Sequence, residues 1–430
     1  MFTHLPDEKR ASRTAATLLV LLALMLVLPS SVYAGKKKKL APAKPEPVGP
    51  VYDPAKLDTT KLVWPEPPNI ARIKWLNYYA GMKVDYTKAE KKKQKSSWMD
   101  RLAGSEQKDM QDVIKDFPFQ MIGPTGIAVD SEGRVYVADP KVGAIFIFNT
   151  ETRDVQLIRN GVEAKFGLIN GLAMDDGDRL FVSDGKFRRV LVFDKDHHSI
   201  GIVNDGMVDP NGIALDKENR FLYVVDTQQD QVLVYDADSY KLLRRIGTSG
   251  KNHWLTDAGN FAAPHSVAVD ADGNVYVTDT MNNRVEIFDA EGKFISQFGK
   301  HCDGPGCFAR PKGIAVDADA HIWVVDQMLD AVQIFNREGQ LLAYMGGHGN
   351  GPGTFAAAIG IAIDKDNRVF VTDQYPGRMQ MFRYVTDAEA AAEKKKQEAE
   401  AEAKAGNSAA QKPAEVKGST QAKAQNAAQK

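Results

Sequence analysis

The sequence predicts an all-β protein folded as a six-bladed β-propeller, and three observations support this. One phrase, clearest in residues 265–289 (HSVAVDADGNVYVTDTMNNRVEIFD), occurs six times along the chain. Apolar and polar residues alternate within each copy, and Asp, Gly and Asn bound the runs, which is typical of strands and tight turns. Each copy is about forty residues long, the length of a four-stranded propeller blade.

Each copy contains three well-defined strands, and a looser fourth follows in most copies. The first strand reads GIAVD (126–130), GLAMD (171–175), GIALD (212–216), SVAVD (266–270), GIAVD (313–317) and GIAID (360–364). The second ends in Asp139, Asp184, Asp226, Asp279, Asp326 and Asp373, and the third in Phe148, Phe193, Tyr235, Phe288, Phe335 and Phe382. The Ala at the centre of each first strand suits the crowded axis. The Asp residues are interpreted as acceptors for free N–H groups of the loops.

The ring is expected to close with a strand from the N-terminal side. The sixth copy has only three strands, because the chain enters a polar tail after Tyr384. IKWLNYYAG (73–81) fits the missing fourth strand, and pairing it with the sixth copy removes an open edge. The propeller is therefore predicted to span residues 70–386, with a helical insert at 87–118 that contains Trp98, Met99 and Leu102.

The segments outside the propeller are low in sequence complexity. Residues 1–34 resemble an export signal, with Arg10 and Arg13 before an apolar run and Val32-Tyr33-Ala34 at its end. They predict a protein of the bacterial periplasm or cell exterior, with an uncleaved anchor as the alternative. Residues 35–69 form a Lys- and Pro-rich linker whose basic run could contact anionic lipid. Residues 387–430, rich in Ala, Glu and Lys, predict a disordered or solvated helical tail.

The net charge and the cysteine content limit which ligands and partners the sequence predicts. The net charge of −1 gives no electrostatic footprint for nucleic acid. The two cysteines, Cys302 and Cys307, lie in HCDGPGC, where a local disulfide is expected in an oxidising compartment. A zinc knuckle would need a second pair, and covalent haem would need C-x-x-C-H, so neither is predicted.

The repeated phrase resembles the NHL repeat. The motifs P-x-G-I-A-V-D, V-Y-V-x-D and R-V-x-x-F-D carry the resemblance over roughly residues 122–385. It implies a six-bladed propeller and says little about function, because this fold hosts many activities.

Candidate ligands are the residues that precede the first strands, since they should ring one mouth of the axial channel. They are Thr125, Asn170, Asn211, His265, Lys312 and Ile359. Propeller enzymes keep metals at this place.

Two enzyme families offer a comparison. Peptide-amidating lyases resemble the chain and bind zinc through P-H-x motifs in three alternate blades, of which only Pro264-His265-Ser266 is present here. The gluconolactonase and paraoxonase group binds calcium, and its P-N-G phrase resembles Pro210-Asn211-Gly212. A Ca²⁺ or Zn²⁺ site would draw on Asn170, Asn211, His265 and His253, although no carboxylate can be assigned to it. The alternative is that Asn merely caps the entry to a strand.

The sequence thus favours an exported, non-enzymatic scaffold that binds a protein partner through propeller loops. The resemblance suggests an electron-transfer system with multihaem cytochromes as the partner class. The competing interpretation is a metal-dependent, lactonase-like hydrolase or lyase at the channel mouth.

Overall fold

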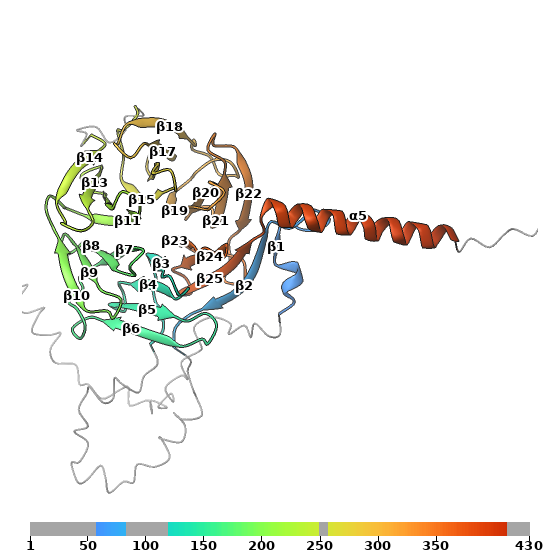
Figure 1. The fold of residues 1–430 in the computed structure, drawn as a ribbon, viewed down its shortest axis with the longest axis horizontal. Helices are drawn as coiled ribbons and strands as arrows, with labels where there is room; N and C mark the ends of the chain where they lie inside the picture. Colours follow the sequence, from blue (N-terminus) through green and yellow to red (C-terminus); the bar gives the residue numbers. More distant parts are fainter. Residues whose placement is uncertain (1–56, 83–118, 249–256, 411–430) are drawn as a thin grey trace, which may run out of the picture. The chain divides into compact units, whose positions relative to one another are not determined.

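A computed structural model describes residues 57–82, 119–248 and 257–410, and side chains only up to residue 399. The predicted signal segment (1–34) and helical insert (87–118) and most of the linker lie outside these residues. Within them, six antiparallel sheets stand around a common axis (Figure 1), which confirms the six-bladed β-propeller.

Every blade follows the same order, with the strand that comes first in sequence innermost. Blade one comprises β3 (Ile127–Val129), β4 (Val135–Asp139), β5 (Ala144–Phe148) and β6 (Val155–Arg159); blade two, β7 (Ile169–Met174), β8 (Leu180–Asp184), β9 (Arg189–Phe193) and β10 (Ser199–Val203); blade three, β11 (Pro210–Asp216), β12 (Phe221–Asp226), β13 (Gln231–Asp236) and β14 (Leu242–Ile246). Blade four comprises β15 (Pro264–Val269), β16 (Val275–Asp279), β17 (Arg284–Phe288) and β18 (Phe294–Phe298); blade five, β19 (Pro311–Val316), β20 (Ile322–Asp326), β21 (Ala331–Phe335) and β22 (Leu341–Gly346).

Blade six closes the ring in the predicted way. It contains β23 (Ala358–Ile363), β24 (Arg368–Asp373), β25 (Arg378–Tyr384) and, outside β25, the N-terminal strand β2 (Ile73–Tyr79). Trp75 of β2 lies opposite Phe382, is almost fully buried, and donates its indole N–H to Gln380 Oε1 at 3.0 Å. The strand therefore brings both apolar burial and a specific hydrogen bond to the blade.

The sheet of blade six extends further toward the N-terminus than the boundary at residue 70 predicts. A short 3₁₀ turn, η2 (Thr59–Lys61), leads into β1 (Val63–Trp64), which pairs with β2 as a fifth strand. The Trp64 ring meets Phe382 edge-on at 5.9 Å between ring centroids. The end of the predicted linker thus belongs to the blade, because its aromatic residue finds an apolar partner there.

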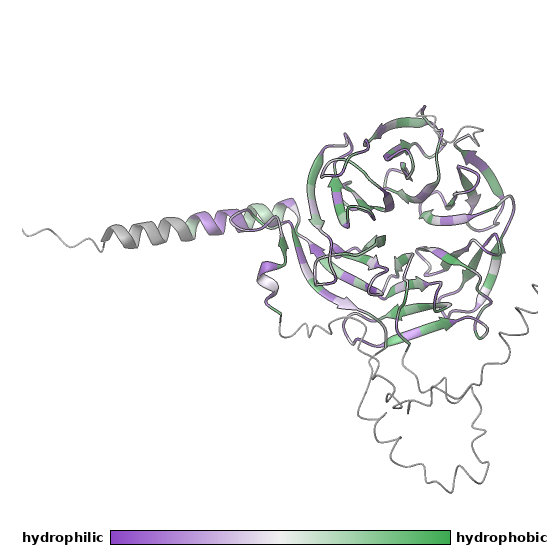
Figure 2. Ribbon diagram, turned by 180° about the vertical axis from the view of Figure 1, so that it is seen from behind, coloured by the Kyte–Doolittle hydropathy of each residue, from purple (hydrophilic) through white to green (hydrophobic). Residues whose placement is uncertain are grey.

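The core lies between the blades. The apolar side chains of the second and third strands are buried in clusters that each join neighbouring sheets. Figure 2 shows apolar residues concentrated along the strands and hydrophilic ones at the turns. Neighbouring innermost strands contact one another around the axis, and β23 contacts β3. Packing is thus continuous around the ring.

The tail begins as a helix, α5 (Asp387–Ala410), in agreement with the helical one of the two predicted alternatives, a disordered or a solvated helical tail. Thr386 accepts the N–H of Glu389 at its start, and Glu389 forms an ion pair with Arg383 of β25 at 2.6 Å. No helix among the described residues is long and apolar enough to cross a bilayer.

Candidate functional site

The axial channel contains a cavity of about 160 Å³ at the end where the innermost strands begin. Its lining has three levels, and all six blades contribute. The mouth is formed by Thr125, Asn170, Asn211, His265 and Ile359; the middle by Gly126, Gly171, Gly212, Ser266, Gly313 and Gly360; and the deepest level by Ile127, Leu172, Ile213, Val267, Ile314 and Ile361. Lys312 itself does not line the cavity, although the next two residues do.

A β-bulge positions the mouth residues. In blades two to six, the pairing of the first strand with the second shifts register just where the mouth residue and the following Gly or Ser lie. A bulge redirects a side chain away from the regular alternation of a strand. The mouth side chains can therefore line the channel while the rest of the strand keeps its pairing.

The middle level must be small because the innermost strands nearly touch. A Cβ atom on Gly126 would lie 2.1 Å from the Asn170 carbonyl oxygen, and one on Gly212 would lie 2.5 Å from Ser266 Cα. The Gly126 N–H uses this approach to donate a 2.7 Å hydrogen bond to Asn170 O. We predicted this crowding at the central Ala of each first strand, whereas the innermost strands approach one another most closely at the Gly two residues before it.

Hydroxyl groups from every second blade tie the mouth together. Ser183, Thr278 and Thr372, each just before a closing Asp, donate to the mouth carbonyls of Asn211, Lys312 and Thr125 at 2.5, 2.8 and 2.7 Å. Each bond runs from one blade to the next. The sequence analysis missed these residues, although their alternation between blades is visible in the second strand.

Two of the polar mouth side chains, those of Thr125 and Asn211, form hydrogen bonds within the wall of the channel. Thr125 Oγ1 donates to backbone carbonyl oxygens of β7, including that of Asn170 at 3.2 Å. Asn211 Nδ2 donates to Thr227 Oγ1 at 3.3 Å, and Thr227 in turn donates to Pro264 O. These contacts are those of residues that fasten the entry to a strand.

His265 differs from its neighbours in the mouth. Its Nδ1 atom is buried and lacks a hydrogen-bond partner. Burial, reinforced by Lys312 and Arg310, holds the pKa of His265 well below its usual value, so the imidazole is neutral near pH 7. Burial, together with Arg310, also lowers the pKa of Lys312 to about 8. The mouth is therefore locally positive on the side of blades four and five.

The donor set at the mouth does not fit Ca²⁺ or Zn²⁺. Among the described residues, no three His, Cys, Asp or Glu side chains come together as a metal site. Calcium needs carboxylate or carbonyl oxygens, and structural zinc needs several His or Cys ligands. Asn170 and Asn211 could offer two amide oxygens to calcium, but a complete set needs about six to eight oxygens, and the single His265 is too few for zinc. Lys312 adds an opposing charge. His253, the predicted companion of His265, lies outside the described residues.

The closing Asp residues hold the loops rather than a ligand. Asp139 Oδ2 accepts the backbone N–H groups of Ile122 and Gly123 at 2.6 and 2.9 Å, while Oδ1 accepts those of Lys141 and Val142 at 3.0 Å. Asp184 and Asp326 make corresponding contacts in their blades. The predicted role of these carboxylates is confirmed, and it makes the surrounding loops rigid.

We define the entry face as the face made by the loops that precede the first strands and by the turns that join the second and third strands. Its exposed large apolar side chains are Ile122, Val162, Leu168, Phe187, Met281, Met328 and Tyr375. All other exposed large apolar side chains of the described residues lie on the outermost strands. The opposite face is formed by the turns that join the first to the second strand and the third to the fourth strand of each blade. It has no exposed large apolar side chain among the described residues and carries ion pairs such as Arg220 with Asp238.

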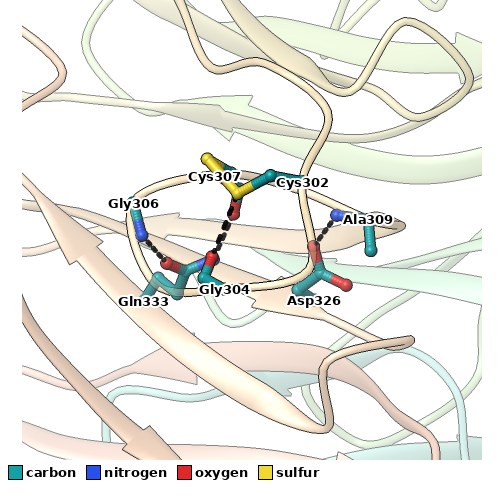
Figure 3. Close-up of a disulfide and its surroundings, with 7 residues drawn as sticks. All are labelled: Cys302, Gly304, Gly306, Cys307, Ala309, Asp326 and Gln333. Carbon is teal, nitrogen blue, oxygen red and sulfur yellow. Dashed lines mark hydrogen bonds between the residues drawn. A yellow bond between two sulfur atoms is a disulfide. The ribbon is translucent and has the colours of Figure 1, made fainter.

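The loops that enter blades five and six share one architecture, and one of them contains a disulfide. The structure joins Cys302 and Cys307, whose Cα atoms are 5.3 Å apart (Figure 3). Gln333 accepts the N–H of Gly306 at 2.7 Å and donates to Cys307 O at 2.7 Å. Gln380 makes the same pair of bonds to Gly353 and Thr354 in blade six, where no cysteine occurs.

Blade four has Glu286 in the position of these glutamines, another residue that the sequence analysis did not single out. Its carboxylate accepts the N–H of Gly259 at 2.8 Å and forms an ion pair with Arg284. Burial of the carboxyl group raises the pKa of Glu286 to about 7. A carboxylate therefore titrates near neutrality beneath the entry face.

Comparisons with known families agree with the fold. The NHL repeat matches residues 122–148, a 6-bladed beta-propeller family matches 318–389, and the SMP-30/gluconolactonase/LRE-like region matches 181–309. These matches confirm the predicted repeat type and blade number, and they include a family that contains lactonases.

Individual relatives match only in part. The Drosophila melanogaster protein brain tumor is 50% identical over 42 residues, which is 10% of this chain and 4% of that protein. Human NHL repeat-containing protein 2 is 28% identical over 91 residues, 20% of this chain and 12% of that protein. The chain thus matches only a small part of these relatives.

Solved structures share the fold at low identity. A Bacteroides thetaiotaomicron protein of unknown function has a TM-score of 0.50 and 16% identity, covering 61% of this chain and 70% of its own. Virginiamycin B lyase from Staphylococcus aureus has a TM-score of 0.45 and 13% identity, covering 61% of this chain and 96% of its own. At such identities the likeness concerns the fold.

Proposed function

We propose that this six-bladed β-propeller of NHL-type repeats is a non-enzymatic binding scaffold that holds a protein partner on its entry face. The observation that carries the proposal is the contrast between the two faces of the propeller: the entry face has exposed large apolar side chains, whereas the opposite face has none among the described residues. Exposed apolar side chains that lie on one face can serve as anchors for a protein partner. Met328 and Tyr375 are 71% and 59% exposed, and both lie on the second–third strand turns.

The entry face combines apolar anchors with positive charge. Lys141 Nζ lies 5.3 Å from the centroid of the Tyr375 ring, and Lys165 and Arg189 lie over the Phe187 ring at 5.3 and 4.9 Å. Aromatic residues, Met and Arg are the side chains enriched in protein interfaces. A partner that complements this face would present apolar side chains together with carboxylates.

The described parts of the entry-face loops are fastened to the blades and can act as a preformed surface. The closing Asp residues and the Gln333 and Gln380 side chains fasten the loops through several backbone hydrogen bonds each. Binding to a preformed surface loses less conformational entropy than binding to a mobile one. A scaffold role uses this rigidity directly, without any reactive group.

We further propose that the protein works outside the cytoplasm, in the periplasm or at the cell exterior, and that its partner is an exported electron-transfer protein of the multihaem cytochrome class. The export-like sequence of residues 1–34 supports this placement. The Cys302–Cys307 disulfide supports it independently, because such bonds persist in oxidising compartments.

A metal-dependent lactonase-like hydrolase or lyase is the second candidate, favoured by the match of residues 181–309 to the SMP-30/gluconolactonase region. The described channel mouth argues against it, since no three His, Cys, Asp or Glu side chains come together there among the described residues. We therefore place this function second.

Site-specific photocrosslinking tests the scaffold proposal. A benzophenone amino acid at Met328 of the entry face should form an adduct of defined mass in the native cell envelope. The same probe at Leu342 of β22, on the outer rim of the same blade and 50% exposed, is the control and should form none. Adducts from position 342 alone, or from neither position, would refute a partner on the entry face.

A further inference from the structure

Three nitrogen-bearing side chains lie close to one another at the channel mouth. His265 belongs to blade four, and Lys312 holds the same position in blade five, two residues after Arg310. Among the described residues, no side-chain hydrogen bond or ion pair is made by any of the three. Most arginines elsewhere in the ring are paired, as Arg378 is with Asp373 at 3.0 Å and Arg368 with Asp364 at 2.6 Å.

Leaving Lys312 unpaired is costly, because a half-buried charge loses hydration without gaining a counter-charge, whereas Arg310 is exposed and keeps its hydration. The His265 Nδ1 atom is buried with no acceptor or donor opposite it. Asp209 holds the position of Arg310 two blades away, in blade three, and its carboxyl forms no ion pair with Lys312 or Arg310 among the described residues. An anion supplied from outside would resolve the imbalance.

The cavity below the mouth limits the size and character of that anion. Its volume of about 160 Å³ is close to the roughly 150 Å³ of a protein cavity that accepts benzene. Its deepest level consists of six aliphatic side chains, one from each blade, among them Ile127, Ile213 and Ile314. A ligand that fits has one charged end and a short apolar body.

We propose that the channel mouth binds a small aliphatic carboxylate, with its carboxylate group beside Arg310, Lys312 and His265 and its apolar part against the deep aliphatic level. The half-buried ammonium group of Lys312 is partly shielded from water, which strengthens its hydrogen bond to a carboxylate, and the exposed guanidinium group of Arg310 can add a second charge-assisted hydrogen bond at the rim. The site is independent of the proposed partner, since it needs only the channel and its mouth. The same carboxylate chemistry could be offered by a free acid or by the C-terminus of a peptide.

Calorimetric titration of the full chain with butyrate tests the proposal. The titration is run at pH 6.5, where Lys312 with its pKa of about 8 is charged. We expect saturable binding of butyrate and at least tenfold weaker binding of butyramide, its neutral counterpart. N-acetyl-alanyl-valine, with a free carboxylate, distinguishes the two sources: binding of this peptide but not of butyrate assigns the carboxylate to a polypeptide end.

Matched variants keep the test specific. Lys312→Met keeps the stem and removes the charge, and it should weaken carboxylate binding at least tenfold, whereas Lys312→Arg should retain most of it. Lys217→Met, an exposed lysine on the opposite face, should bind as the wild type does. Equal binding of butyrate and butyramide, unchanged binding in Lys312→Met, or no saturable binding of either carboxylate would overturn the proposal.

Discussion

At the scale of single residues, this protein uses carboxylates mainly to organise its backbone. The closing Asp residues accept loop N–H groups, and the Asp at the end of each first strand does the same for the next turn, as Asp130 does for Glu132 and Arg134. Glu286 is the exception, because it is buried where two other blades have Gln333 and Gln380. The difference between a carboxyl and an amide at one position gives a direct test.

Glu286→Gln should remove a pH-dependent loss of stability. The pKa of Glu286 is raised from 4.5 to about 7 in the folded protein. Its stabilising contribution is therefore fully present below pH 4.5 and is lost as pH rises through 7. Thermal or urea unfolding should show the variant gaining on the wild type by on the order of 3 kcal/mol between pH 4 and pH 8.

The variant should fold, because blade six already combines an arginine with a glutamine at these positions, Arg378 with Gln380. Glu291→Gln, at an exposed turn of blade four, is the control. A stability difference between Glu286→Gln and the wild type that does not change with pH would show that Glu286 does not titrate in this range.

The mouth residues predict a second result, an absence of metal dependence. Titration with EDTA, then with Ca²⁺ or Zn²⁺, should leave the melting temperature of the wild type unchanged. An ion at a hundred times its Kd would add about 2.7 kcal/mol, which is easily measured. The double variant Asn211→Ala/His265→Ala should respond as the wild type does. A metal-dependent shift in the wild type that is lost in the double variant would favour the hydrolase instead.

At the scale of strands and loops, closure depends on elements far apart in sequence. β2 and β25 are separated by most of the chain, yet they pair from Ile73 with Tyr384 to Tyr79 with Met379, with one register shift between Trp75 and Asn77. The loops that enter blades five and six are each fastened by one amide side chain, and only the loop into blade five also contains a disulfide. Two predictions follow from these elements.

Deleting residues 61–82 should destabilise the whole ring. The deletion removes β1 and β2, and with them the buried side chains of Ile73, Trp75 and Tyr79. Each fully buried side chain of this size contributes roughly 1.5–3 kcal/mol, so a loss of several kcal/mol is expected in urea unfolding. Truncation after residue 398, within the exposed part of α5, should have no effect. Equal melting of the β2-deleted and parent proteins would contradict closure by β2.

The disulfide should make a modest contribution. Cys302 and Cys307 are five residues apart, so the bond closes a short loop and stabilises by on the order of 2 kcal/mol. Mass spectrometry of protein from an oxidising compartment should find no free thiol, and Cys302→Ser/Cys307→Ser should melt earlier. The loop should still form, because the equivalent loop around Gly349 and Thr354 forms without cysteines. Two free thiols under non-reducing conditions would count against the bond.

At the scale of the whole molecule, the six-fold repetition explains what could be predicted from sequence. Strand alternation and turn residues are local, and they predict the blades, the closing strand and the roles of the closing Asp residues. The bulge at the channel mouth, the hydroxyl bonds of Ser183, Thr278 and Thr372, and the fifth strand of blade six depend on which residues face one another across blades. The sequence shows the alternation of the hydroxyl residues between blades, but it does not show which carbonyl oxygens they meet.

The candidate site was predictable in position but not in chemistry. The phrase before each first strand places Thr125, Asn170, Asn211 and His265 at the channel mouth, and the structure brings them together around one cavity. Arg310 was not singled out, because a single arginine in a loop gives no signal until its lack of a partner is seen. The apolar entry face was likewise hidden, since its residues are spread over five blades.

The central claim is that the entry face holds a protein partner, and affinity measured on matched variants tests it most directly. With the crosslinked partner purified, its Kd should be measured for the wild type, for Met281→Ser/Met328→Ser/Tyr375→Ser on the entry face, and for Ile295→Ser/Leu342→Ser on the outer rim. We predict at least tenfold weaker binding by the entry-face variant, about 1.4 kcal/mol or more, and wild-type affinity for the rim variant. Unchanged affinity of the entry-face variant, or a loss confined to the rim variant, would contradict the account.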